Sequence, residues 1–110
     1  MCGIAGWLGR KKSNDNIVAD GILKSLSHRG PDDNQSLIKK NFGLLFSRLS
    51  IMDLSENGMQ PLSDNDGHIF SVFNGEIYNY LQLRKEINSA GFSLKSTCDA
   101  ETIPFLYKII

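Results

Sequence analysis

The sequence has few of the residues that mark several large classes of protein. Its 110 residues include only two cysteines, Cys2 and Cys98, which are too few for a disulfide framework. No apolar run is long enough to cross a bilayer. The 12 basic and 12 acidic residues cancel, so total charge does not favour nucleic acid or an anionic membrane surface. We therefore expect a partner that is a small molecule or a protein, and no nucleic acid or membrane.

Signals for export, metal binding and nucleotide binding are also missing. The basic residues at positions 10–12 follow the apolar N-terminal stretch, whereas a secretory signal places them before it. His28 and His68 match no zinc spacing with the cysteines, and neither GxxxxGK[ST] nor GxGxxG occurs. We expect a cytoplasmic protein with two reduced thiols, and no metal or other cofactor on this chain.

Local patterns predict a layered α+β domain. Residues 2–8 are small and apolar, as in a buried strand, which would place the N-terminus inside the fold. Further strands are predicted at residues 35–40, 42–52, 68–74 and 92–96. Helical periodicity predicts three helices, which are marked by Ile17, Ile22, Leu23 and Leu26 after a cap at Asn14 or Asp15, by Tyr80, Leu83 and Ile87 before Gly91, and by a start at Asp99 with no cap at the far end.

Cys2 is the first candidate for chemistry, because of its position. A free cysteine is usually an inert small hydrophobic residue. Removal of Met1 would leave Cys2 with both a thiol and a free α-amine, whose ordinary pKa of about 7.7 to 8 lets it accept the thiol proton at neutral pH. Cys2 would then be nucleophile and base in one residue.

The segment FNGEIYNY, residues 73–80, is the candidate for an oxyanion site. Asn-Gly is first of all a hairpin signal, but that reading needs a strand on both sides. Helical periodicity follows Glu76, so we place Asn74 and Gly75 at a bend from strand to helix. There the Asn74 side-chain amide and the Gly75 N–H can stabilise a developing oxyanion.

Three charged residues have both an ordinary and a functional interpretation. Arg48 lies in an apolar run, as a solvated edge position or as a bidentate clamp for a carboxylate. Glu76 and Asp99 suit the first turn and the N-cap of helices. If all three line one cavity, they offer one cation to a carboxylate and two anions to an ammonium group. That arrangement complements the head group of an amino acid.

Six motifs stand in order along the chain, namely MCGIAGW, HRGPDD, RLSIMDLS, GMQPL, FNGEIYNY and CDAET. Together they resemble the N-terminal glutaminase domain of glutamine-hydrolysing asparagine synthetases, which are class II, N-terminal-nucleophile glutamine amidotransferases. The resemblance covers essentially the whole chain. It implies a four-layer sandwich of two mainly antiparallel sheets between helices. It also implies that processed Cys2 attacks the side-chain amide of glutamine, forms a thioester and releases ammonia.

The resemblance also assigns roles to individual residues. Asn74 and Gly75 would form the oxyanion hole, Arg48 would hold the glutamine carboxylate, and Glu76 and Asp99 would receive its ammonium group. The remaining pocket residues would be Leu49, Ser50, Ile51 and Met52. The HRGPD and GMQPL motifs would shape loops, with no chemistry assigned to Arg29 or Gln60.

Some features depart from the family pattern. Phe46 and Ser47 stand where many relatives have a histidine, and Cys98 stands where many have serine. Residues 1–110 also end where the family's glutaminase domain continues, so we expect an incomplete domain. The synthetase domain of the family is expected to be absent from these residues. By resemblance, that domain uses ATP and magnesium, and its acceptor is aspartate. The alternative hypothesis is a silent module that binds glutamine or a partner subunit. A homo-oligomer stays open.

Overall fold

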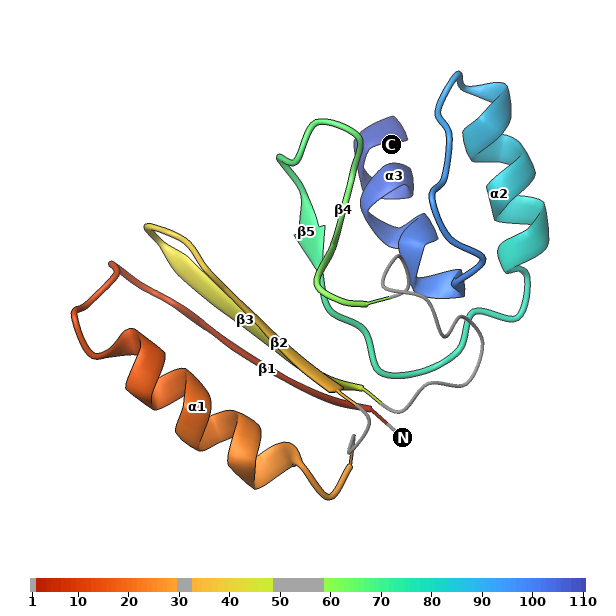
Figure 1. The fold of residues 1–110 in the computed structure, drawn as a ribbon. Helices are drawn as coiled ribbons and strands as arrows, with labels where there is room; N and C mark the ends of the chain where they lie inside the picture. Colours follow the sequence, from red (N-terminus) through yellow and green to blue (C-terminus); the bar gives the residue numbers. More distant parts are fainter. Residues whose placement is uncertain (1, 30–32, 49–58) are drawn as a thin grey trace. The chain divides into compact units, whose positions relative to one another are not determined.

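A computed structural model describes residues 2–29, 33–48 and 59–110 of the chain (Figure 1). These residues belong to two compact units, Met1–Leu49 and Ser50–Ile110. Within the described residues, three α-helices and two antiparallel sheets confirm the predicted α+β class. None of the helices in these ranges has both the length and the hydropathy to cross a membrane.

The first unit is a three-stranded antiparallel sheet with one helix against it (Figure 1). Its strands are β1 (Gly3–Leu8), β2 (Asp33–Ile38) and β3 (Phe42–Arg48), in the order β1-β3-β2. The helix α1 (Asp15–Leu26) packs Ala19 and Leu23 against Leu45 of β3. Because side chains alternate across a strand, the register fixes which face α1 covers, and that face includes Ala5 and Trp7 of β1.

The helix predicted around Ile22 and Leu23 is confirmed, although Ile17 is not part of its buried face. Ile17 is 75% exposed, and the core contact falls instead on Ala19, which lies one turn before Leu23. Asn14 occupies the N-cap but makes no side-chain capping bond. Asp15 closes the first turn instead, because its carboxylate accepts the Lys12 N–H at 2.8 Å.

The N-terminal strand is confirmed, but the prediction that it is buried is wrong. β1 pairs only with β3 among the described strands, so it is an edge of the sheet. Its residues alternate in exposure, and Leu8 is 91% exposed. The apolar composition of residues 2–8 therefore reflects a strand with one face against α1.

The second unit combines a short hairpin with two longer helices. The hairpin pairs β4 (Leu62–Ser63) with β5 (Phe70–Ser71). The helix α2 (Tyr80–Ser89) follows, and the short 3-10 helix η2 (Asp99–Glu101) leads into α3 (Thr102–Ile109). A helix is predicted from the residues around Tyr80, where α2 begins, and from Asp99, where η2 begins and α3 continues. The predicted strand at 68–74 is shortened to the two residues of β5.

Helices α2 and α3 lie side by side in Figure 1 and supply the core of the second unit. Ile87 and Phe105 are buried, and the Phe105 ring lies 5.8 Å from the Phe92 ring between centroids. Gly91 ends α2 as predicted, with a φ of 96° that suits glycine. The Phe92 N–H donates to the Ile87 carbonyl, which completes a Schellman ending.

The strand predicted at 92–96 is wrong, because this segment bonds to a helix instead of a sheet. The N–H groups of Lys95 and Ser96 each donate to the Glu101 carboxylate at 2.8 Å, and the Ser96 hydroxyl donates to it at 2.7 Å. Glu101 is buried, so these bonds satisfy its charge locally. In the same segment, the Phe92 ring packs against Phe105 of α3.

Candidate active site

Cys2 and Arg48 are placed by the register of the first sheet. The last pair of the β1–β3 ladder is Gly3 with Ser47, and Cys2 and Arg48 are the residues that come next after that pair on the two chain segments. Gly3 faces α1, because a Cβ atom built on it would lie 3.2 Å from the Leu26 Cβ. By alternation, Cys2 and Arg48 therefore belong to the opposite face of the sheet.

Arg48 is buried, which contradicts its interpretation as a solvated edge residue. It is 7% exposed at the end of β3, and Asp33 of β2 pairs with it across the sheet. A buried guanidinium needs hydrogen-bonding or anionic partners. Cys2 is half-buried, and its carbonyl accepts a long hydrogen bond, 3.4 Å, from the Arg29 Nε. The candidate nucleophile thus lies next in register to a buried cation.

Asn74 and Gly75 lie between β5 and α2, which agrees with the predicted bend from strand to helix. A two-residue type I′ hairpin would need positive φ at both positions. No non-glycine residue in the described ranges has positive φ, and the glycines that do are Gly9, Gly67 and Gly91. A Cβ atom at position 75 would lie 2.9 Å from the Phe73 ring, so glycine also fits closely here.

The loop that carries Asn74 and Gly75 is fixed at both ends by buried side chains. On one side, the Gln60 amide bonds both main-chain groups of Phe73: its Nε2 donates to the Phe73 carbonyl at 3.2 Å, and its Oε1 accepts the Phe73 N–H. On the other side, Asp99 Oδ2 accepts the Ile77 N–H at 2.7 Å. The segment 73–77 therefore spans two anchors, which restricts its main chain.

Asp99 bonds to this loop and Glu76 belongs to it, and the two residues differ in exposure. Asp99 is 6% exposed, whereas Glu76 is exposed at the surface. The Asp99 bond to Ile77 ties its carboxylate to the residue that follows Glu76. The Cys98 thiol donates to Asp99 Oδ1 at 3.7 Å, and burial raises the pKa of Cys98 above its usual value. Cys98 is thus held as a neutral thiol beside the acid.

The predicted site residues divide between the two units. Cys2 and Arg48 belong to the first, and Asn74, Gly75, Glu76 and Asp99 to the second. The predicted pocket residues 49–52 lie outside the described residues.

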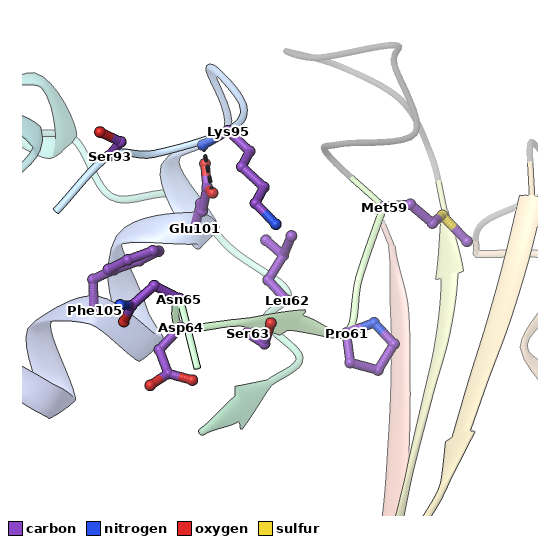
Figure 2. Close-up of a pocket in the computed structure, with 10 residues that line it drawn as sticks. All are labelled: Met59, Pro61, Leu62, Ser63, Asp64, Asn65, Ser93, Lys95, Glu101 and Phe105. Atoms are coloured by element: carbon purple, nitrogen blue, oxygen red, sulfur yellow. Dashed lines mark hydrogen bonds between the residues drawn. The ribbon is translucent and has the colours of Figure 1, made fainter. Parts of the chain in front are cut away.

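A cavity of about 250 Å³ in the second unit is separate from these residues (Figure 2). It lies beside the β4–β5 hairpin and α3, and its lining includes Leu62, Phe105 and the bonded pair Lys95 and Glu101. None of the six predicted site residues that the structure describes lines it. We therefore assign the cavity to the packing of the hairpin on α3.

Charged groups at the hairpin turn are paired within the protein. Lys108 of α3 bonds the side chains of Asp64, at 3.2 Å, Asn65, at 2.9 Å, and Asp66. Burial alone would raise the pKa of Asp64, but the N–H groups of Ile69 and His68 and the Lys108 ammonium lower it to about 2. Within the described residues, no group of three or more histidine, cysteine or acidic side chains could hold a metal ion.

Comparison with known families decides the relationship. A model of the glutamine amidotransferase domain matches residues 1–109. The chain belongs to this glutamine amidotransferase family. The resemblance seen in the six motifs is therefore confirmed.

Relatives of this amidotransferase domain include glutamine-hydrolysing asparagine synthetases. Asparagine synthetase 2 of Bacillus subtilis is 41% identical over 98% of this chain, which covers 15% of that protein. Asparagine synthetase 1 of the same organism is 36% identical over 98% of this chain and 18% of its own length. Amidase chyE of Penicillium rubens is 38% identical over 98% of this chain and 18% of its own length. The chain thus spans less than a fifth of these relatives.

Two contacts in this amidotransferase domain are not predicted from its sequence. Gln60 and Arg29 were assigned to loop-shaping motifs, and the structure shows them bonded to Phe73 and Cys2, both at or next to predicted catalytic residues. The residue type gave no signal for the Gln60 contact, because glutamine is usually exposed and the burial of Gln60 shows only in the structure.

Proposed function

We propose that this domain hydrolyses glutamine to glutamate and ammonia through a thioester on Cys2. The Cys2 α-amine, freed by loss of Met1, takes the thiol proton, and the sulfur attacks the side-chain carbonyl carbon of glutamine. The resulting oxyanion accepts hydrogen bonds from the Asn74 side-chain amide and the Gly75 N–H. The C–N bond then breaks, and the amine-held proton leaves with ammonia.

The second half of the reaction regenerates the thiol. Water attacks the thioester carbonyl carbon while the α-amine takes its proton, and the same two donors stabilise the second oxyanion. The C–S bond breaks, glutamate leaves and the sulfur recovers the proton. In this proposal Arg48 holds the α-carboxylate of glutamine as a cation. Glu76 and Asp99 hold its α-ammonium group, and residues 49–52 complete the pocket.

The observation that carries the proposal is the end of the β1–β3 ladder, where Gly3 pairs with Ser47 and the next residues are Cys2 and the buried Arg48. It is supported by the match of the family over residues 1–109. A buried guanidinium beside a nucleophile favours a substrate with a carboxylate a few bonds from its reacting carbon. The doubly anchored loop supports the oxyanion role, because it presents Asn74 and Gly75 on a fixed main chain.

The wider setting of the reaction belongs to the same proposal. In this setting the protein is cytoplasmic, and ammonia passes to a synthetase domain or subunit that uses ATP and magnesium, with aspartate as acceptor. Relatives named as glutamine-hydrolysing asparagine synthetases support the synthetase part of this setting. Residues 1–110 would then be the incomplete N-terminal part of a four-layer sandwich. ATP and magnesium would bind outside these residues. Association into homo-oligomers also fits this setting.

The test combines labelling with kinetics. The protein is exposed to an electrophilic glutamine analogue, its intact mass is measured, and the label is mapped by fragmentation. We expect loss of Met1 and one adduct on Cys2 that excess glutamine blocks. Cys98→Ala is the matched control, because it removes the other thiol. It should keep the adduct and the ammonia release, whereas Cys2→Ala should lose both.

Two outcomes would count against the proposal. Ammonia release that survives in Cys2→Ala would exclude the thioester route. Binding of glutamine without label and without ammonia release would instead support the alternative of a silent glutamine-binding module. Retention of Met1 would point the same way, because a blocked amine cannot act as the base.

A further inference from the structure

We infer that Gln60 is a positioning residue for the oxyanion hole, acting through the main chain of Phe73. The inference rests on the proposed function, because it concerns the hole formed by Asn74 and Gly75. It goes beyond that function by naming a residue that touches neither glutamine nor the reacting atoms. Gln60 is 5% exposed, so its side-chain amide is committed to contacts inside the protein.

The place of Gln60 in the hairpin explains why its side chain does this work. The last pair of the β4–β5 ladder is Leu62 with Ser71, and two residues further out on each strand lie Gln60 and Phe73. Pro61 lies between Gln60 and Leu62, and it has no N–H to donate to a ladder. The Gln60 amide takes the place of a main-chain partner, because it offers one donor and one acceptor to the two main-chain groups of Phe73.

Phe73 transmits this constraint in two ways. Its carbonyl carbon is bonded directly to the Asn74 nitrogen, so fixing the Phe73 peptide groups fixes where the Asn74 main chain starts. Its ring also lies against Gly75, close enough that a Cβ atom there would approach it to 2.9 Å. Both proposed oxyanion donors therefore follow Phe73, and a displacement of about 1 Å in such donors is costly to the rate.

The other anchor of the loop, Asp99, does not replace Gln60. Asp99 anchors the far end through Ile77, four residues after Phe73. With that end held and Gln60 removed, the main chain gains freedom at Phe73 and Asn74, where the donors begin, whereas Glu76 stays next to the anchored Ile77. Loss of Gln60 should therefore disturb the transition state more than the binding of the glutamine head group, which the proposal assigns to Arg48, Glu76 and Asp99.

The experiment compares Gln60→Leu and Gln60→Glu with the wild-type protein. Asp15→Ala is the control, since it too removes a buried side chain that accepts a main-chain N–H, but in the first unit. Glutaminase rates give kcat and KM. The aldehyde analogue of glutamine forms an adduct with Cys2 in which a tetrahedral carbon carries the oxygen. Its inhibition therefore reports on the oxyanion hole. Inhibition by glutamate reports on head-group binding, and thermal unfolding checks the fold.

For Gln60→Leu we expect kcat to fall by about 10- to 100-fold while the KM for glutamine changes by less than about 3-fold. The aldehyde should lose affinity in step with kcat/KM, and glutamate should keep its affinity. Asp15→Ala should retain the wild-type kinetics. Gln60→Glu keeps the acceptor, and its protonated form restores a donor, so its rate relative to wild type should rise as the pH falls from about 8 to about 5.

Each result separates the two proposals. Wild-type kcat in a folded Gln60→Leu variant, or a loss confined to KM, would overturn the role of Gln60 and leave the proposed function standing. A loss of rate without a matching loss of aldehyde affinity would also overturn it. A wild-type protein that releases no ammonia would instead contradict the proposed function itself, and the positioning role would fall with it.

Discussion

Asp99 has one task in the structure and a second in the proposed function, and two substitutions separate them. Its carboxylate anchors the loop by accepting the Ile77 N–H, and the proposed function also gives it the ammonium group of glutamine. Asp99→Asn keeps a carbonyl oxygen for Ile77 but removes the negative charge. Asp99→Ala removes both. We expect Asp99→Asn to bind glutamine poorly in a nearly intact fold, and Asp99→Ala to be impaired in binding and in stability.

The magnitudes follow from the geometry. The bond from the Ile77 N–H to the carboxylate is 2.7 Å long, and Asp99 is 6% exposed. Hydrogen bonds to charged groups contribute about 1.5 to 3 kcal/mol, and a neutral replacement about 1 kcal/mol. Asp99→Ala should therefore lower the unfolding free energy by about 1.5 to 3 kcal/mol, and Asp99→Asn by about half of that or less. Losing the charge should raise the KM for glutamine by about 10- to 100-fold in both variants.

The assay measures initial rates of ammonia release against glutamine concentration, together with urea unfolding followed by circular dichroism. A wild-type KM in Asp99→Asn would refute the assignment of the ammonium group to Asp99. Equal stability of the Ala variant and the wild type would refute the anchor. Glu76→Gln is a useful comparison, because Glu76 is exposed at the surface and should change KM with little effect on stability.

Two further substitutions test other parts of the structure. The pKa of Asp64 is lowered from 3.8 to about 2, so its carboxylate stabilises the fold above about pH 4 and that contribution is lost as the pH falls toward 2. The gap in urea midpoint between wild type and Asp64→Asn should close over that range, and a gap independent of pH would contradict this. In Gly43→Ala, a Cβ atom would lie 2.4 Å from the Trp7 ring, and we expect a loss of about 1 to 3 kcal/mol with a change in tryptophan fluorescence. Gly21→Ala, with nothing within 4 Å, should be neutral or slightly stabilising, and an equal loss there would refute the ring contact.

Local pattern predicts much of the fold because it is set by neighbours in sequence. The helical spacing from Ile22 and Leu23 to Leu26 indicates α1, and that of Tyr80, Leu83 and Ile87 indicates α2. Gly91 marks the end of α2 by its need for positive φ. Prediction fails at 92–96, where alternation resembles a strand but the main-chain N–H groups donate to a buried carboxylate. A side-chain acceptor of this kind leaves no periodic signal.

The candidate site divides in the same way. The residues of the proposed site can be named from the sequence, because Cys2, Asn74 and Gly75 lie in motifs that resemble the family whose model matches residues 1–109. The contacts that hold them are not readable, because they join residues far apart in the sequence. Gln60 bonds a residue 13 positions away, and Asp99 bonds one 22 positions away. Such pairs depend on a loop closing in space, which composition and spacing do not encode.

The contacts of Lys108 bear on how the second unit opens. One ammonium group near the C-terminus of α3 bonds three successive side chains of the hairpin turn, Asp64, Asn65 and Asp66. The hairpin cannot separate from α3 without breaking all three bonds, so the two elements should exchange their amide hydrogens as one cooperative unit. Gln60 and Phe73 lie at the base of that hairpin. The lifetime of the ordered Asn74–Gly75 loop is therefore linked to the last helix of the unit.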